Sequence, residues 1–373
     1  MHADILHMKH MLNRELDELY VSMAIRAFAL SVVGIFVPIY LLQIGLSVYS
    51  VILYYLVYVV TRFFFAAPAA RLAARHGLKK MMFLSNALMA VYFVALRFAN
   101  DVGIDVNYLA VLAGVAVTLF WTSYHIDFVK FSKKKYTGEE LSMSNMLVSV
   151  SSFLGPFIGG ASILIFGFNP VLIVAVILLV LSMLPLFFSK DTHDPYTFSM
   201  KNVIAGRPGR EYAGHIGFGI EAFAGIFWVL IIFLTITDNL ASLGFVASIS
   251  LAFSLILSYI SGKYSSKNPF RVLKIGAIAL TLIWSIRLLV KDFFQLLVSD
   301  SLYGSSRPAT DISYDTVTYQ KARKKTAEYI VFREMMIPLG GIIIMSLLLL
   351  INDINYSIYF AIIGSLLLIA FRK

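Results

Sequence analysis

Long apolar runs alternate with short polar segments along the whole 373-residue chain. A run of about 20 apolar residues is long enough for an α-helix to cross the roughly 30 Å hydrocarbon core of a bilayer. The pattern therefore predicts an integral, multi-pass membrane protein. Eleven apolar spans are predicted, at residues 18–44, 48–70, 81–99, 104–128, 142–166, 169–189, 213–236, 241–261, 272–290, 326–350 and 354–371.

The stretch SDSLYGSSRPATDISYD, residues 299–315, departs from this pattern because it carries four charged side chains between two apolar spans. A charged side chain at the bilayer centre costs roughly 2.5 to 3.5 kcal/mol, so such residues must face protein or water. Their spacing places them on one helical face. We therefore predict a twelfth span, residues 293–317, with a polar stripe made of Asp300, Gly304, Arg307, Asp311 and Asp315.

Basic residues predict the topology of these twelve spans. Alternate loops hold 24 of the 31 Lys and Arg residues, whereas the opposite loops hold only Arg97, Arg287 and Lys291. Cytoplasmic loops are enriched in Lys and Arg, so we expect both termini in the cytoplasm. If residues 293–317 formed a loop, the last two spans would invert and the pattern would break. The net charge of +10 is thereby explained by topology, and no nucleic acid partner is expected.

Motifs for catalysis or cofactor binding are not found in the sequence. The chain has no cysteine, which excludes disulfides and thiolate metal ligands. No nucleophile with a base, metal cluster or phosphate-binding loop occurs at a usable spacing. The polar segments are all short loops, so no nucleotide-binding domain is predicted. We expect neither an enzyme, nor a metal site, nor a cofactor.

Short sequence echoes relate the two halves of the chain. AIRAFA at 24–29 parallels GIEAFA at 219–224, so that Arg26 and Glu221 hold equivalent places. At an offset of 190, VYFVALR parallels TLIWSIR, and Ser-Tyr-His at 123–125 parallels Ser-Tyr-Asp at 313–315. Internal repeats of this kind are typical of transporters. They predict a division into an N-terminal half, a central cytoplasmic loop and a C-terminal half, at 1–189, 190–212 and 213–373.

Two parallel six-span halves joined by a cytoplasmic loop resemble the major facilitator superfamily over essentially the whole chain. The segment RLAARHGLKK resembles the family signature between spans two and three, and keeps Arg75, Gly77 and Lys79 but lacks the signature's acidic residue. GPFIGG, beginning with Gly155 and Pro156, resembles the end of a motif frequent in family exporters. It also has the composition that close helix packing in a membrane requires.

The resemblance implies an all-α protein of 12 transmembrane helices that moves a small molecule by alternating access. Spans one, four, seven and ten of the family line a central cavity. The resulting candidates for substrate binding or coupling are Arg26, Trp121, Tyr124, His125, Glu221, Trp228, Asp300, Arg307, Asp311, Tyr314 and Asp315. The gate candidates are Arg62, Arg75, Gly77, Lys79, Gly155, Pro156, Arg333 and Glu334.

Several roles stay open at this level. Arg26 and Glu221 either pair across the halves as a gate, or Glu221 carries a proton while Arg26 binds an anionic group. Asp300 and Arg307 lie nearest the middle of the membrane and are the better binding candidates. His125 either relays protons or is held by hydrogen bonds.

Asp311 and Asp315 lie one helical turn apart, and three roles are weighed for them. They either share a proton, or coordinate sodium, or are neutralised in part by Arg307.

The sequence favours a proton-coupled antiporter that exports amphipathic compounds. The alternatives are a transporter of an anionic metabolite, and a receptor or lipid-handling protein on the same scaffold. The expected partners are a small-molecule substrate, protons and the lipid bilayer. We expect a monomer in the plasma (inner) membrane.

Overall fold

The computed structural model describes residues 14–188, 196 and 199–371, and its regular structure there is entirely helical. The part of the central loop at 189–195 and 197–198 and the chain ends lie outside the described residues. The helices are α2 (Arg14–Val33), η1 (Gly34–Phe36), α3 (Val37–Gln43), α4 (Val48–His76), α5 (Leu78–Val102), α6 (Val106–Phe131), α7 (Thr137–Ser152), α8 (Gly155–Phe166), α9 (Phe168–Phe188), α10 (Met200–Ile204), α11 (Gly209–Thr235), α12 (Leu240–Lys267), α13 (Pro269–Arg287), α14 (Phe293–Ala322), α15 (Thr326–Ile351) and α16 (Tyr356–Leu368).

Ten helical segments of the described chain are long and apolar enough to cross a membrane. Two of them contain a break: η1 joins α2 to α3, and residues 153–154 separate α7 from α8. The apolar helix α16 is shorter, with 13 residues. The charged stretch at 299–315 is helical throughout, within the 30-residue α14. Asp292 caps this helix by accepting a hydrogen bond from the Gln295 amide (2.9 Å).

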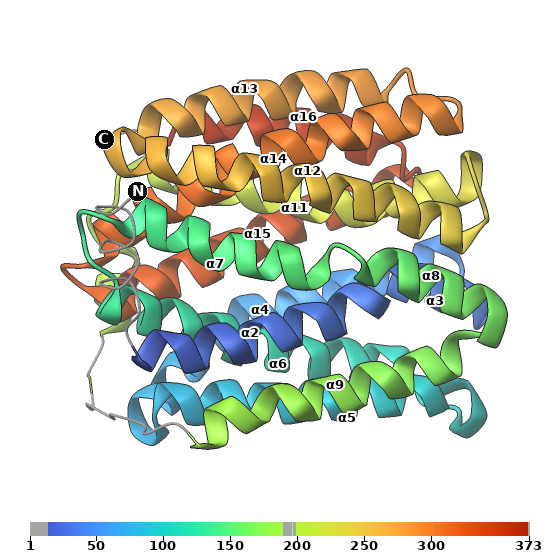
Figure 1. Ribbon diagram of the computed structural model, residues 1–373, viewed down its shortest axis with the longest axis horizontal. Coiled ribbons are helices and arrows are strands. Elements are labelled where there is room, and N and C mark those ends of the chain that lie inside the picture. The colour runs from blue at the N-terminus through green and yellow to red at the C-terminus, as the bar shows by residue number, and fades with distance from the viewer. Residues whose placement is uncertain (1–13, 189–195, 197–198, 372–373) are drawn as a thin grey trace, which may run out of the picture.

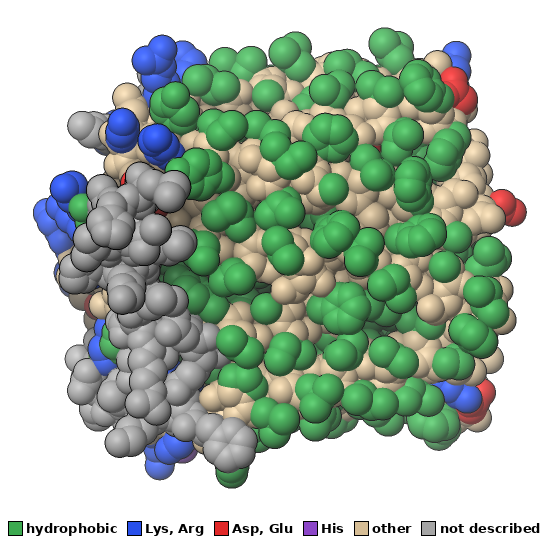
Figure 2. Space-filling view, viewed as in Figure 1, with side chains coloured by type: hydrophobic (Ala, Val, Ile, Leu, Met, Phe, Trp, Pro, Cys, Tyr) green, Lys and Arg blue, Asp and Glu red, His purple; other side chains and the backbone are tan. Residues whose placement is uncertain are grey.

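The helices lie roughly side by side along one axis (Figure 1). Helices α2 to α9 occupy one side of the bundle, and α11 to α16 occupy the other. Helix α2 begins at the same end of the bundle as α16 ends, at the left of Figure 1. We call this the basic end, because Lys and Arg side chains gather there (Figure 2). Its exposed members include Arg75, Lys80, Lys133, Lys263 and Lys267.

Helices α7 and α8 pack closely against α12 through small residues. A Cβ atom on Gly160 would lie 2.1 Å from the Leu240 carbonyl oxygen, and one on Gly244 would lie 2.1 Å from the Pro156 carbonyl oxygen. Glycine at these positions lets the two backbones approach. Gly155 of the GPFIGG segment lies against the side chain of Ser31 on α2, where a Cβ atom would meet the Ser31 hydroxyl. The segment thus joins α8 both to α2 and to α12.

Gly244→Ala is expected to lower the free energy of unfolding by about 1 to 3 kcal/mol, because the added methyl group meets backbone that must shift. Thermal unfolding of the detergent-purified protein measures the loss. The matched control is Gly225→Ala on α11, where a Cβ atom meets nothing within 4 Å, and we expect no loss there. If both variants lose the same amount of stability, the backbones of α8 and α12 are not in tight contact at Gly244.

Candidate functional site

A cavity of about 400 Å³ lies inside the bundle, between α2, α4, α6 and α7 on one side and α11, α14 and α15 on the other. Part of its wall is apolar and aromatic, and comprises Met23, Trp121, Phe218, Phe223 and Ile337 among others. Its charged and titratable lining residues are Arg62, His125, Asp311, Asp315, Arg333 and Glu334. The cavity therefore combines aromatic faces with charges of both signs.

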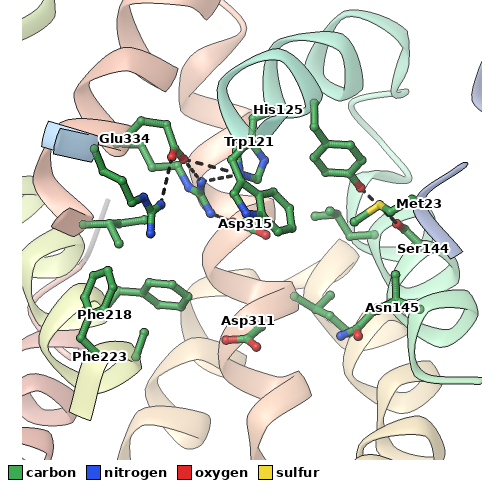
Figure 3. A pocket seen from close by; sticks show the side chains of 18 of the residues that line it. Met23, Trp121, His125, Ser144, Asn145, Phe218, Phe223, Asp311, Asp315 and Glu334 are labelled. Carbon is green, nitrogen blue, oxygen red and sulfur yellow. Dashed lines mark hydrogen bonds and ion pairs between the residues drawn. The ribbon is translucent and has the colours of Figure 1, made fainter. Parts of the chain in front are cut away.

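Asp311 lies across the cavity from the two phenylalanines, with Asn145 on its other side (Figure 3). One carboxylate oxygen accepts a hydrogen bond from Arg307 Nε at 2.9 Å. The other oxygen has no hydrogen-bond partner among the described residues. The side chain is 32% exposed, whereas this unpartnered oxygen is itself buried. This is the arrangement expected of a carboxylate that can accept a proton or a cationic group.

Arg333 is the centre of an ionic cluster in the cavity wall. Its Nη2 contacts an Asp315 oxygen at 2.9 Å, and its Nη1 contacts both Glu334 Oε1 and His125 Nε2. A guanidinium group has no acceptor, so His125 Nε2 accepts this hydrogen bond and Nδ1–H donates to the Tyr319 hydroxyl. The imidazole is consequently held on both sides.

The same cluster joins the two sides of the bundle. Arg62 on α4 lies 3.6 Å from Glu334 on α15. His125 on α6 meets Tyr319 on α14 and Arg333 on α15. The structure thus brings the expected gate residues Arg62, Arg333 and Glu334 together with His125, which was expected to bind or couple, and the gate role stays a prediction.

A second ionic cluster lies between α11, α13 and α14. Glu221 is fully buried and pairs with Arg307. Its Oε1 also accepts hydrogen bonds from Trp284 Nε1 (3.0 Å) and the Tyr303 hydroxyl (3.0 Å). Arg307 contacts both Glu221 and Asp311, so it links this second cluster to the cavity.

Asp300 pairs with Arg287 at the edge of the same cluster. Trp228 Nε1 donates to Asp300 at 3.2 Å. The Arg287 guanidinium lies over the rings of Trp284 and Tyr303, at 4.3 and 4.2 Å from their centroids. Such cation–π contacts compensate part of the cost of removing the charge from water.

Arg287 corrects one sequence expectation. The sequence analysis counted it with the basic residues of a loop, at the end of the predicted span 272–290, but it ends α13 and is only 3% exposed. Its ion pair with Asp300 explains how the charge is accommodated there. Asp300 and Arg307, the candidates expected to be best for binding, do not line the cavity described above.

Arg26 is not paired with Glu221 in this structure. It is 4% exposed, and its guanidinium carbon lies 3.9 Å above the Phe120 ring centroid. Within the described residues its guanidinium has no ion pair, and its Nε has no hydrogen-bond partner. A buried charge without a counter-ion is energetically costly, so Arg26 is a candidate for binding a negatively charged group.

The remaining candidates are spread between the cavity and other places. Trp121 lines the cavity and stacks on His125, with ring centroids 5.2 Å apart. Tyr124 also lines it and shares a hydrogen bond with Ser144 (3.1 Å). Tyr314 is fully buried behind the wall, stacked on Phe218 at 4.1 Å.

Three gate candidates lie at the basic end, in the junction between α4 and α5. Gly77 has φ of +104°, a conformation that favours glycine, and it ends α4 where α5 begins. Arg75 is exposed and Lys79 is buried. None of the three lines the cavity.

Sequence reasoning missed several residues of these clusters. Asn145 and Phe218 line the cavity, and Tyr303, Trp284 and Arg287 surround the second ionic cluster. The last two belong to the repeated segment TLIWSIR, so the repeat was the available signal. Asn145 and Phe218 carry no signal of their own, because an isolated Asn or Phe in a span is common.

A family model described as Major Facilitator Superfamily matches residues 19–208, just over half of the chain. The chain belongs to the major facilitator superfamily. Family membership, together with the helical fold, indicates an integral, multi-pass membrane transporter and not an enzyme. No curated protein sequence matches this chain significantly.

Solved structures of major facilitator transporters share its fold. The E. coli fucose:proton symporter FucP is 12% identical with a TM-score of 0.70, covering 95% of this chain and 97% of that chain. A bacterial homologue of the iron transporter ferroportin is 12% identical with a TM-score of 0.71, covering 96% and 98%. The human organic anion transporter MFSD10 is 10% identical with a TM-score of 0.70, covering 96% and 99%. At such identities the likeness concerns the fold of the superfamily and not the substrate.

Proposed function

We propose that this superfamily member crosses the plasma (inner) membrane twelve times, with α14 and α16 as the tenth and twelfth spans and the basic end in the cytoplasm. The proposal divides the chain into the halves 1–189 and 213–373, joined by a loop at 190–212. Equivalent packing supports the repeat: Gly114 on α6 abuts the Tyr58 carbonyl of α4, and Gly304 on α14 abuts the Ser250 carbonyl of α12.

We further propose that the 400 Å³ cavity is the substrate site of an alternating-access transporter. Its walls come from both halves, so a rocking of one half against the other would expose it to either side. The cluster of Arg62, His125, Asp315, Arg333 and Glu334 would act as a gate that separates when the cavity opens toward the basic end.

The substrate class we propose is an amphipathic molecule with a cationic group, exported in exchange for protons. The observation that carries it is Asp311, whose carboxylate lines the cavity opposite aromatic rings and has one buried oxygen without a hydrogen-bond partner among the described residues. Aromatic faces attract apolar and cationic groups alike. A carboxylate that binds either a proton or a substrate cation, but not both, couples export of the substrate to entry of protons. The proton coupling named for FucP lends support by analogy.

Within this mechanism, Glu221 has a positioning role and does not carry the coupling proton. It lies outside the cavity lining and is held by three donors, Trp284, Tyr303 and Arg307. Arg307 is then shared between Glu221 and Asp311. When a proton or a substrate cation neutralises Asp311, Arg307 keeps Glu221 as its counter-ion, so no charge is left unpaired.

Thermal unfolding of the detergent-purified monomer, at pH 6 and pH 8, tests the substrate class. A ligand at 100 times its Kd adds about 2.7 kcal/mol to the stability of the folded state. We expect stabilisation by lipophilic cations such as ethidium and tetraphenylphosphonium, and a weaker effect at pH 6, because protons compete for Asp311. If ligands that carry a carboxylate or phosphate group stabilise the protein and lipophilic cations do not, the substrate is not a cation.

Arg26 supports a second candidate, a transporter of an anionic metabolite. Its buried guanidinium has no counter-ion among the described residues, and an anionic substrate group would supply one. The organic anion transporter MFSD10 shares the fold. In that case Arg26→Gln would abolish stabilisation by the anion. If neither cations nor anions bind, and no transport is found, the receptor or lipid-handling alternative gains weight.

A further inference from the structure

A second cavity, of about 570 Å³, lies at the basic end, outside the proposed substrate site. Residues 202–211, which lead into α11, form one side of it, and residues 320–329, at the turn from α14 to α15, form the other. Its charged lining residues are Arg207, Glu211, Lys321, Lys324 and Lys325. Four of these five are basic.

The single carboxylate of this lining is already used by two of the basic groups. Lys321 Nζ contacts Glu211 Oε1 at 2.8 Å, and Arg207 Nη1 lies 3.7 Å from Glu211 Oε2. Lys324 and Lys325 are exposed, and their ammonium groups have no ion pair or hydrogen bond within the described ranges. Among the described lining residues, the four basic side chains thus outnumber the one carboxylate.

Arg207 is held in a defined orientation at this cavity. Its Nε donates to the Val203 carbonyl, and its guanidinium carbon lies 4.6 and 4.4 Å from the ring centroids of Tyr329 and Phe332. A guanidinium group fixed in this way needs little reordering when it binds an anion. Helices α11 and α15 begin beside it, at the lining residues Pro208 and Lys325, and their positive ends add to the same potential.

We propose that this cavity binds a phosphate-bearing anion. Lysine ammonium groups and an oriented guanidinium are the donors that phosphate oxygens prefer, and two or more negative charges would match the excess on the lining. The phosphate belongs either to the headgroup of an anionic phospholipid or to a soluble compound. Bound there, it holds residues 202–211 against the α14–α15 turn. The two helices joined by that turn carry Asp315, Arg333 and Glu334 of the ionic cluster, so the ligand stabilises the arrangement described here.

Binding is tested on the full-length protein in detergent by thermal unfolding. The probes are sodium pyrophosphate, ATP and short-chain dihexanoyl phosphatidylglycerol, each compared with sodium chloride at the same ionic strength, because salt screens exposed charges. The test variant is Lys324→Gln/Lys325→Gln. The matched control is Lys263→Gln/Lys267→Gln, which removes two exposed lysines from the same end but outside the cavity.

We expect at least one probe to raise the melting temperature of the unmodified protein and of the control. The test variant should bind the same probe on the order of tenfold more weakly, since each lost ammonium removes a charge-assisted hydrogen bond. A response to phosphatidylglycerol alone assigns the site to a lipid headgroup, and a response to pyrophosphate or ATP assigns it to a soluble phosphate. The proposal is overturned if no probe acts beyond the salt control, or if the test variant responds as the control does.

Discussion

Asp311→Asn is expected to abolish proton-driven transport and to remove the stabilisation by lipophilic cations. The substitution keeps the size of the side chain, and Arg307 keeps Glu221 as counter-ion, so the fold should persist. The cavity then loses the carboxylate for which proton and substrate compete. Uptake of a stabilising fluorescent cation into inverted proteoliposomes, driven by an imposed pH gradient, measures the effect, and we expect a fall to background.

Two further carboxylates provide controls for this experiment. Asp315→Asn removes a partner of Arg333 but leaves the unpartnered oxygen of Asp311, so cation binding should remain even if the transport rate changes. Asp101→Asn alters an exposed residue that does not line the cavity and should behave as the unmodified protein does. Uphill transport by the Asp311→Asn variant at the normal rate would refute the proposed coupling site.

Glu221→Leu is expected to lower the free energy of unfolding by about 3 to 5 kcal/mol, because two buried donors lose their acceptor at roughly 1 to 3 kcal/mol each. The change leaves Arg307 with Asp311 as its only carboxylate and removes the acceptor of Trp284 and Tyr303. Donors left buried without partners carry the full cost of desolvation. Reversible unfolding in mixed micelles of increasing SDS content measures the difference between variant and unmodified protein.

An exposed carboxylate serves as the control for stability. Asp238→Leu should change the free energy of unfolding by less than about 0.5 kcal/mol, because Asp238 is exposed and its side chain has no hydrogen bond or ion pair within the described residues. Glu221→Gln keeps one acceptor oxygen and separates positioning from coupling. If it transports uphill, Glu221 only positions Arg307. If it exchanges substrate but cannot transport uphill, the coupling proton belongs to Glu221 and our assignment to Asp311 is wrong.

Both clusters follow from the cost of a buried charge. Glu221 and Asp311 share Arg307, and Asp315 and Glu334 share Arg333, so each of these two guanidinium groups contacts two carboxylates. Neutralising one carboxylate of such a set leaves the guanidinium still paired. A carboxylate at the cavity can therefore be neutralised without leaving an arginine unpaired. Arg26 lies outside both sets. The Arg26→Gln variant should therefore lose binding of an anionic substrate and keep binding of a cationic one.

Local sequence patterns determined the helices and the segregation of charge. The intervals of four, three, four and four residues in 300–315 predicted a helix, and α14 is continuous through that stretch. The alternation of basic and non-basic loops predicted that lysines and arginines would gather at one end, as they do. Periodicity and loop composition depend on residues that are close together in the sequence. They can therefore be interpreted without knowing how the helices pack.

Only the tertiary structure decided which charges meet. The sequence placed Arg26 and Glu221 in equivalent positions and left their pairing open, but Glu221 meets Arg307 on its own side of the bundle. Arg287 was counted with the basic residues of a loop, yet it ends α13 and is buried against Asp300. Such pairings depend on the rotation and crossing of each helix, which are set by contacts such as those of Gly160 and Gly244. A sequence pattern specifies the face of a helix that is polar, whereas the partner of that face is set by packing between helices distant in sequence.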